Sequence, residues 1–215
     1  MYLNELTVLY VDEALLVLDK PAGLLSVPGR GEDKQDCLSA RAQALYPDAL
    51  VVHRLDMATS GLLVMARSPA AQRSVNDAFA TRQVHKRYLA VVDGLLATPP
   101  NDWGVIDLPI IVDWPNRPRR IIDHERGKPS LTRYQVLLHD LVANTTRLLL
   151  EPVTGRSHQL RVHLLAVGHA IVGDALYASP VVHAQSDRLL LHACSLALPH
   201  PTSGQTMRFD SPPRF

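Results

Sequence analysis

Cysteine, long apolar runs and glycine-rich phosphate motifs are scarce or missing in this 215-residue sequence. The two cysteines, Cys37 and Cys194, lie far apart without any metal-ligand spacing, so neither a disulfide framework nor a structural zinc site is indicated. No apolar stretch reaches the roughly eighteen residues of a membrane span, and no basic-then-apolar leader opens the chain. We therefore expect a cytoplasmic protein without a membrane association.

Several catalytic classes lack their motifs. Neither the dinucleotide-type nor the P-loop glycine pattern occurs, so a nucleotide cofactor is not implied. Ser60 lies near His53 and Asp56 in the sequence, but no nucleophile elbow surrounds it and the three residues are too close together for a triad of the usual geometry. His158 and His163 are five residues apart without an intervening acid, which does not fit a helical zinc motif.

The net charge is only +1, but it is unevenly distributed. Residues 1–50 hold eight acids and four bases, a net of −4, which leaves a net of +5 for residues 51–215. One basic cluster is Arg82, Lys86 and Arg87; a second is Arg117, Arg119, Arg120, Arg126, Lys128 and Arg133. Either cluster could neutralise nucleic-acid phosphates, and a solvated charged surface explains each equally well.

The order of predicted elements indicates an α+β fold with a mixed, mostly antiparallel sheet and flanking helices. The length suits a single domain over residues 1–215, built as two tightly joined lobes. Strands are expected at residues 6–11, 14–18, 62–66, 88–92, 105–110, 120–124, 131–138, 147–151, 189–198 and 207–209. Helices are expected from a cap at Asp36 to Leu45, from Ser68 to Arg82, and from a cap at Ser157 to Gly168.

Asp56, in the run HRLDMATSG that starts at His53, is the main candidate for chemistry. A carboxylate beside apolar core is a competent nucleophile or base if a cation keeps it ionised, and Arg54 and Arg161 are the available cations. The alternative is that Asp56 caps a local turn with Thr59 and Ser60, which is the commoner role of an isolated Asp in such a run. His53 would by default be a hydrogen-bonded structural histidine.

Two further segments carry candidate functional side chains. A helix that begins near Ser157 sets His158 and Arg161 one turn apart on one face, which could point Arg161 into a cleft. Lys86 and Arg87 lead directly into Tyr88 at the start of a strand. Tyr88 is more often a core residue in this setting, but an aromatic ring next to cations also suits stacking on an unpaired base.

Together these motifs resemble the RluA-type pseudouridine synthases. The stretch HRLDMATSGLLVMA is preceded by DKPAGLLSVPGR and followed by KRYLAVV, then TGRSHQLRVHLLAVGHAIVGDALY and RLLLHA, in the order of that family. The resemblance runs from about Val11 to the last residue. The DWPNRP segment, LSVPGR and the short length resemble the dual-specificity members. Larger relatives carry an N-terminal S4 domain, which we expect to be missing here.

The resemblance implies the fold, the reaction and the site. It implies the pseudouridine synthase fold with a central catalytic cleft, and the conversion of uridine to pseudouridine in stem-loops of tRNA and 23S rRNA with base flipping. No cofactor or metal is needed, and no obligate protein partner is evident. The catalytic residues that it implies are Asp56, Tyr88 and Arg161, with Arg161 paired to the aspartate and Leu190 or Leu191 forming an apolar pocket floor.

The remaining site residues are hypotheses about how the RNA is held. We expect the extruded nucleotide to be contacted by His53, Arg54 and Thr59. The flanking RNA backbone would be gripped by Arg82, Lys86, Arg117, Arg119 and Arg120. A non-catalytic RNA-binding module, the same chemistry on a single RNA class, and a nucleoside or sugar hydrolase that pairs Asp56 with a second carboxylate stay open as alternatives.

Overall fold

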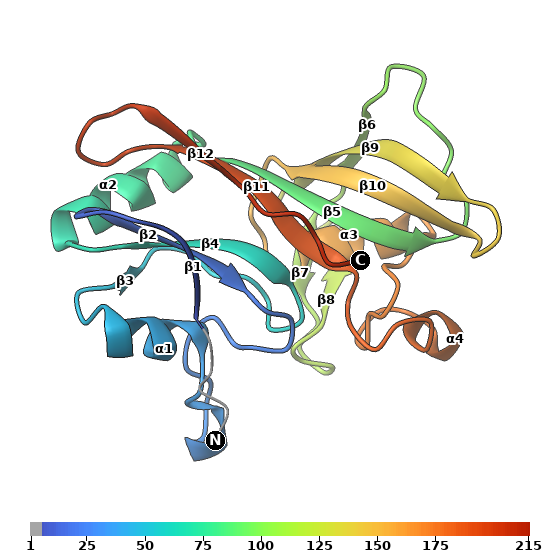
Figure 1. The fold of residues 1–215 in the computed structure, drawn as a ribbon. Helices are drawn as coiled ribbons and strands as arrows, with labels where there is room; N and C mark the ends of the chain where they lie inside the picture. Colours follow the sequence, from blue (N-terminus) through green and yellow to red (C-terminus); the bar gives the residue numbers. More distant parts are fainter. Residues whose placement is uncertain (1–5) are drawn as a thin grey trace. The chain divides into compact units, whose positions relative to one another are not determined.

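The computed structural model describes residues 6–215, and the chain divides into two compact units (Figure 1). Unit 1 comprises the residues up to Lys86 together with His192–Arg214, and unit 2 comprises Arg87–Leu191 with Phe215. None of the helices in the described part of the chain has both the length and the apolar character needed to cross a bilayer.

Unit 1 is built on a sheet with the strand order β1, β2, β4, β11, β12, with the short β3 paired to β4. The strands are β1 (Thr7–Val11), β2 (Leu15–Lys20), β3 (Leu50–Val51), β4 (Ser60–Ala66), β11 (Leu191–Pro199) and β12 (Thr206–Asp210). All pairings are antiparallel except β4 with β11, where His192 lies opposite Ser60. Every residue of β4 is buried, as are five of the six residues of β2, so these two strands form the core of the unit.

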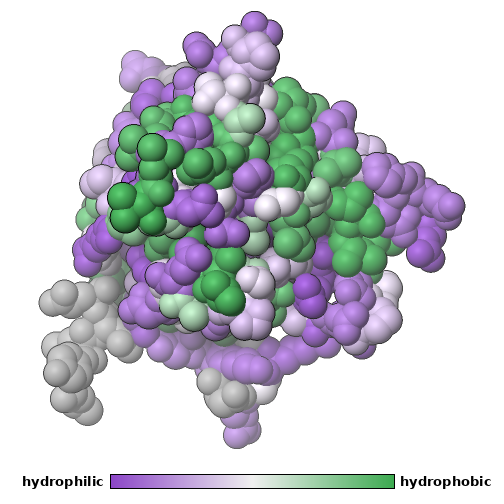
Figure 2. Space-filling view, turned by 90° about the vertical axis from the view of Figure 1, so that its right-hand side faces the viewer, coloured by the Kyte–Doolittle hydropathy of each residue, from purple (hydrophilic) through white to green (hydrophobic). Residues whose placement is uncertain are grey.

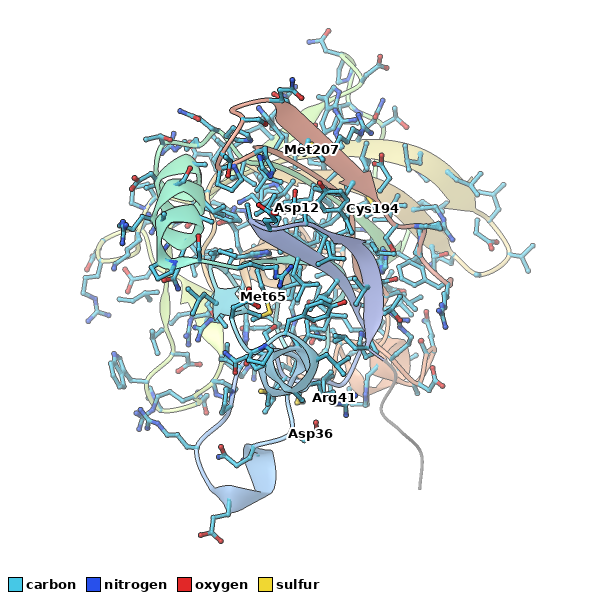
Figure 3. The ribbon with its side chains drawn as sticks, turned by 60° about the vertical axis from the view of Figure 1, so that its left-hand side comes forward. Asp12, Asp36, Arg41, Met65, Cys194 and Met207 are labelled. Carbon is cyan, nitrogen blue, oxygen red and sulfur yellow. The ribbon has the colours of Figure 1, made fainter. Side chains whose placement is uncertain are left out.

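Two α-helices and a 3-10 turn complete unit 1: α1 (Leu38–Leu45), α2 (Pro69–Ala80) and η1 (Glu32–Lys34). Ser68 caps α2 as its sequence indicates, accepting a hydrogen bond from Ala71 N at 3.1 Å, and α2 packs on β4 and β3. The predicted cap of α1 was wrong. Cys37 occupies that position, and its Sγ accepts from Ala40 N, whereas Asp36 forms an ion pair with Arg41 at 2.6 Å (Figure 3).

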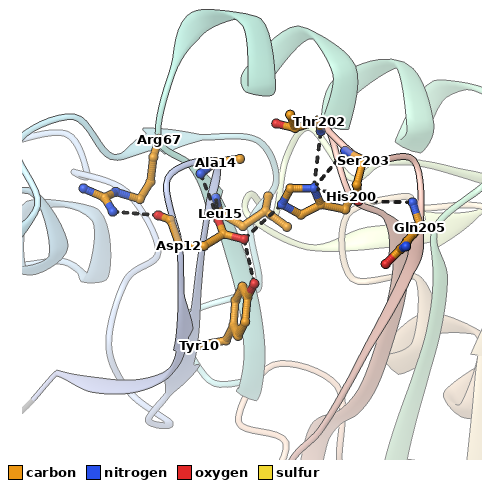
Figure 4. Close-up of polar contacts among 9 residues, drawn as sticks. All are labelled: Tyr10, Asp12, Ala14, Leu15, Arg67, His200, Thr202, Ser203 and Gln205. Atoms are coloured by element: carbon orange, nitrogen blue, oxygen red, sulfur yellow. Dashed lines mark hydrogen bonds and ion pairs between the residues drawn. The ribbon is translucent and has the colours of Figure 1, made fainter.

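A polar cluster joins the β1–β2 turn to the β11–β12 turn (Figure 4). The Asp12 carboxylate accepts hydrogen bonds from Tyr10 Oη at 2.6 Å, Leu15 N at 2.7 Å and His200 Nε2 at 2.9 Å, and from Ala14 N. Burial raises the Asp12 pKa, but the hydrogen bonds, led by that of Tyr10, outweigh it and bring the pKa down to about 2. Two turns that are far apart in the sequence are thus held together by one ionised side chain.

Unit 2 contains an antiparallel sheet with the strand order β5, β10, β9, β6. Its strands are β5 (His85–Asp93), β6 (Gly104–Asp107), β9 (Leu131–Asp140) and β10 (Thr145–Pro152), and a separate hairpin is formed by β7 (Ile110–Val112) and β8 (Arg120–Ile122). Helix α3 (Gln159–Ala166) packs on β8, β9 and β10, and a short α4 (Pro180–His183) follows. The predicted α+β class with a mostly antiparallel sheet is confirmed.

Unit 2 departs from the sequence expectations in three places. The single strand expected over residues 105–110 is two strands, β6 and β7, with Leu108 and Pro109 between them. The N-cap position of helix α3 is occupied not by Ser157 but by His158, which has a left-handed conformation (φ 58°) and makes no side-chain capping hydrogen bond. Helix α4, which Ser179 caps, was not predicted.

Exposed apolar side chains occur in both units and include Leu141 and Val142 in the turn between β9 and β10. On the face drawn in Figure 2, hydrophobic residues form several groups with hydrophilic residues between them. Scattered exposed apolar residues are normal for a protein surface.

Candidate active site

The segment His53–Thr59 connects β3 to β4 in unit 1, and its backbone is fixed immediately before Asp56. The buried Ser26 hydroxyl donates to Leu55 O at 2.7 Å and accepts from Leu55 N at 3.1 Å. Both backbone polar groups of the residue before Asp56 are therefore satisfied by one side chain. Asp56 itself is half-buried.

Lys20 fixes the residue after Asp56. Its side chain is fully buried, and its ammonium group donates to Met57 O at 3.0 Å, Leu24 O at 2.7 Å and Pro21 O at 2.9 Å. Gly23 N also donates to Met57 O, at 2.9 Å. A buried lysine is stable only when its charge is compensated, and here carbonyl dipoles contribute to that compensation.

The chain then turns tightly into β4. Thr59 N donates to Asp56 O at 3.1 Å, so the turn that the sequence suggested at this point is closed by the backbone carbonyl of Asp56. Thr59 is only 3% exposed. The backbone on both sides of Asp56 is thus held by hydrogen bonds, which limits the positions that its carboxylate can adopt.

A buried chain of hydrogen bonds supports the first residue of β4. Ser60 Oγ lies 2.8 Å from His192 Nδ1, and His192 Nε2 lies 3.0 Å from Ser211 O. Because a carbonyl can only accept, Nε2 carries a proton and donates to Ser211 O. Ser211 Oγ in turn donates to Asp19 Oδ2 at 3.0 Å.

His53 binds the protein backbone. Its Nε2 accepts from Val64 N at 3.0 Å, and its ring packs on Phe79 with a centroid distance of 4.9 Å. Burial, and secondarily the nearby Lys86 ammonium, lowers the His53 pKa to about 3. This imidazole is therefore neutral near pH 7, which fits the structural role that the sequence allowed.

Lys86 is half-buried, with its Nζ 5.9 Å from the Phe79 ring centroid. Burial lowers its pKa. Lys86 therefore packs on the protein, whereas Arg82 and Arg87, the other two members of its basic cluster, are exposed.

In unit 2, Arg161 is almost fully buried and is paired with Asp174. Arg161 Nε and Nη2 donate to the two carboxylate oxygens of Asp174, each at 2.7 Å, and the two side chains are 4% and 1% exposed. The sequence reasoning missed Asp174, because thirteen residues separate it from Arg161 and no helical or strand spacing connects them. Asp174 lies in VGDALY, which ends one of the motifs that carry the family resemblance. In the sequence, that motif alone indicates that Asp174 has a role.

The other predicted residues of unit 2 lie on strands or close to them. Tyr88 is half-buried on β5, opposite Leu150 of β10. Leu190 is half-buried and its carbonyl accepts from Val91 N at 3.1 Å, while Leu191 is 3% exposed. An apolar role suits both leucines.

The predicted backbone-binding arginines differ in their exposure. Arg82 is exposed at the end of α2 with a left-handed backbone (φ 60°), and Arg117 is exposed with its guanidinium 4.8 Å from the Trp114 ring. Arg119 is exposed, and Arg54 is exposed beside Asp56. Arg120 is half-buried and its Nη1 donates to Pro118 O at 2.9 Å, so it is partly occupied within the protein.

Within residues 6–215, no three His, Cys, Asp or Glu side chains gather as a metal site would require. Both ring nitrogens of His163 are used by the protein, with Nδ1 2.9 Å from Thr132 Oγ1 and Nε2 2.9 Å from Leu108 O. The structure thus offers two preorganised groups, the Asp56 loop in unit 1 and the buried Arg161–Asp174 pair in unit 2.

Comparison with known proteins identifies the family. The sequence profile described as RNA pseudouridylate synthase matches residues 14–166, a span that includes Asp56, Tyr88 and Arg161. The chain belongs to the RNA pseudouridylate synthase family, which is a family of isomerases. This confirms the resemblance identified from the motifs.

Individual relatives agree with this assignment. The chain is 50% identical over 210 residues to the protein named dual-specificity RNA pseudouridine synthase RluA of Escherichia coli (strain K12), covering 98% of this chain and 94% of that protein. The protein of the same name from Yersinia pestis is 49% identical over 208 residues, covering 97% and 99% respectively.

Solved structures support the fold. Human RNA Pseudouridylate Synthase Domain Containing 1 matches with a TM-score of 0.80 and 30% identity, covering 98% of this chain and 84% of that chain. Human RNA Pseudouridylate Synthase Domain Containing 4 matches with a TM-score of 0.73 and 28% identity, covering 97% and 89%. The predicted pseudouridine synthase fold is thereby confirmed.

Proposed function

We propose that this protein is a dual-specificity pseudouridine synthase that converts uridines in stem-loops of tRNA and 23S rRNA. The main support is the HRLD segment, whose aspartate lies on a loop held on both sides by Ser26 and Lys20. The name and 50% identity of the Escherichia coli relative support the two classes of RNA. Both units would belong to one catalytic domain acting in the cytoplasm, since the family match at residues 14–166 spans parts of each.

The reaction is an isomerisation in which no atom is lost from the nucleotide overall. The bond from C1′ to N1 breaks, the base turns, and a bond from C1′ to C5 forms. The proton on C5 then leaves and N1 takes up a proton. Asp56 acts either by attacking C1′ or by removing the C2′ proton, and both routes require an ionised carboxylate.

Arg161 and Tyr88 would assist Asp56. We propose that the Arg161 guanidinium, which Asp174 holds, also pairs with the Asp56 carboxylate and orients it toward the sugar. Tyr88 would stack on the target ring and assist the loss of the C5 proton. Leu190 or Leu191 would form the apolar floor beneath the ring.

The target nucleotide must leave its stack before these groups can reach it. Flipping a base out of a folded RNA costs a few kcal/mol, and a loop lowers that cost compared with a helix. Arg54, exposed beside Asp56, would occupy the space near the extruded nucleotide or hold its phosphate. His53 and Thr59 would act through the shape of the loop that they stabilise.

Tritium release tests this function directly. Stem-loop transcripts of tRNA and 23S rRNA labelled with tritium at uridine C5 would be incubated with the wild-type protein, and the modified positions then mapped. We expect release of tritium from both RNA classes and no free uracil. Free uracil would indicate a hydrolase, RNA binding without tritium release would indicate a non-catalytic module, and release from one class only would remove the dual specificity.

A further inference from the structure

Tyr177 of unit 2 contacts both the buried arginine and the arginine-rich hairpin. The side chain is 6% exposed and packs in an apolar cluster with Ile110 of β7 and Val162 of α3. The guanidinium carbon of Arg161 lies over its ring at 5.0 Å from the centroid, and that of Arg119 at 5.5 Å. One aromatic ring thus contacts a proposed catalytic cation and a proposed RNA-binding cation.

The hydroxyl of Tyr177 makes a second connection between the same two elements. Arg120 N, at the first residue of β8, donates to Tyr177 Oη at 2.8 Å. Tyr177 Oη lies 2.6 Å from His158 Nδ1, and because it accepts from Arg120 it can donate its own proton to that nitrogen. The hydroxyl therefore joins the start of β8 to the start of α3.

His158 is placed where this hydrogen bond matters most. It occupies the N-cap position of α3 in a left-handed conformation, which is unfavourable for a residue other than glycine, and Arg161 follows three residues later. The hydrogen bond from Tyr177 helps to hold that conformation. Loss of the bond would leave the first turn of α3, and with it Arg161, less firmly placed.

Asp174 ties the tyrosine backbone to the same guanidinium. Its Oδ1 accepts from Arg161 Nη2 at 2.7 Å, from Leu176 N at 2.9 Å and from Tyr177 N at 3.2 Å. One carboxylate thus holds the Arg161 side chain and the tight turn that presents Tyr177. The hairpin, the tyrosine and Arg161 form one connected network of contacts.

We propose that Tyr177 is a positioning residue that links the Arg119–Arg120 segment to Arg161, so that RNA bound at the hairpin stabilises the catalytic orientation of Arg161. The proposal rests on the proposed function and deepens it. Tyr177 need not touch the reacting uridine for this role, because it acts through the guanidinium and the α3 cap.

Tyr177→Phe tests the link, because it removes only the hydroxyl and keeps the ring. The rate constant of a single turnover at saturating RNA should fall about tenfold, as expected for the loss of about one hydrogen bond at the step. The Kd for RNA should stay within about twofold, since the hairpin surface is unchanged. A merely structural role would instead lower the melting temperature and leave the rate constant at 25 °C unchanged, and that result would overturn the proposal.

Tyr46→Phe is the matched control. Tyr46 also lies under a guanidinium, that of Arg67 at 5.4 Å, but it belongs to unit 1 at the end of α1. Its variant should keep the wild-type rate constant. If Tyr177→Phe lost its cooperative melt, His158→Ala would remove the same hydrogen bond and leave the left-handed backbone without its support, and it should slow the step to a similar extent.

A double-mutant cycle with Arg119→Ala tests the coupling to RNA. In the wild-type background Arg119→Ala should slow the single-turnover step about threefold as well as weaken binding. In the background of Tyr177→Leu, which removes the ring that Arg119 contacts, Arg119→Ala should slow the step no further. Equal slowing in both backgrounds, or none in the wild type, would contradict the link. An inactive wild-type protein would refute the proposed function itself. If the wild-type protein is active but the effects of the Tyr177 and Arg119 substitutions on the rate constant are additive, only the role of Tyr177 is refuted.

Discussion

His53 acts on the protein through a ring nitrogen that must stay unprotonated. Its Nε2 accepts the Val64 N–H, and a proton on that nitrogen would abolish the hydrogen bond. With a folded-state pKa of about 3 against an ordinary value of 6.5, the unfolded chain binds a proton between those two values that the folded chain does not. Stability from this residue is therefore present above pH 6.5 and is lost as the pH falls toward 3.

We expect His53→Gln to flatten the pH dependence of stability. The wild-type free energy of unfolding should fall between pH 6.5 and pH 4 by up to about 1.4 kcal/mol per pH unit because of His53. The glutamine amide oxygen can accept from Val64 N without titrating, so the slope in the variant should be shallower by that amount. Urea denaturation at several pH values measures this. The exposed His124→Gln is the control, and an unchanged slope in His53→Gln would contradict the assigned cause.

The identity of Asp56 as a candidate was readable from the sequence, but the groups around it were not. Ser26 and Lys20 reach the Asp56 loop, and His192 reaches the first residue of β4, from distant parts of the chain. No periodic spacing relates these residues to Asp56. Asp174 was missed for the same reason. Motif order indicates a candidate for the residue that performs the chemistry, whereas the contacts that support that residue depend on tertiary packing.

Element boundaries show the same limit on a larger scale. The strand pattern of residues 105–110 is apolar except for Asp107, yet Pro109 cannot donate to a sheet ladder, and the chain divides there into β6 and β7. Ser157 is a common capping residue type, but the tertiary contact of His158 with Tyr177 accompanies a helix that begins one residue later. Most strands and the Ser68 cap of α2 followed from local patterns, whereas the start of α3 accompanies a contact between elements.

The pairing of β4 with β11 depends on one glycine. Gly61 has φ +107°, and a Cβ there would lie 2.3 Å from Ala193 O and 2.6 Å from Ala193 N. Gly168, at the end of α3, has φ +89° with nothing within 4 Å of its Cβ position. Both glycines therefore have a positive φ that other residues rarely adopt, but only Gly61 has no room for a Cβ atom.

Gly61→Ala should be far more destabilising than Gly168→Ala. We expect a loss of about 1–2 kcal/mol for Gly168→Ala from backbone strain alone. For Gly61→Ala we expect more than about 4 kcal/mol, or no cooperative unfolding transition, because backbone atoms block the new methyl group. Thermal and urea melts of the two variants measure the difference. A similar loss of unfolding free energy in the two variants would show that β4 and β11 can move apart at little cost, and it would contradict this prediction.

For the whole molecule, the charge distribution is a more useful guide than the net charge. The +1 total hides exposed arginines that form no ion pair with any of residues 6–215, among which are Arg82 and Arg117. By contrast, Arg208 is exposed but paired with Asp210 at 3.1 Å. Exposed basic side chains without an acidic partner are those that contribute most to the affinity for RNA phosphates.

Replacing Arg82 and Arg117 together by Ala should weaken RNA binding and lower its salt dependence. Each lost phosphate contact should reduce the slope of log K against log salt by about 0.7–0.9, so the double variant should lose roughly 1.5. Binding titrations between 50 and 300 mM salt, roughly the useful range, measure this slope. Arg208→Ala should keep the wild-type slope. A double variant with an unchanged slope would place the RNA elsewhere on the protein.

The most direct test of the account is a single-turnover assay of Asp56→Asn on RNA labelled with tritium at uridine C5. The amide can neither attack carbon nor accept a proton, so we predict a folded protein that binds RNA with the wild-type Kd and releases no tritium. Asp48→Asn, which removes an exposed partner of Arg67, should react like the wild type. Tritium release by Asp56→Asn at the wild-type rate would contradict the assignment of Asp56 as the residue that carries the reaction.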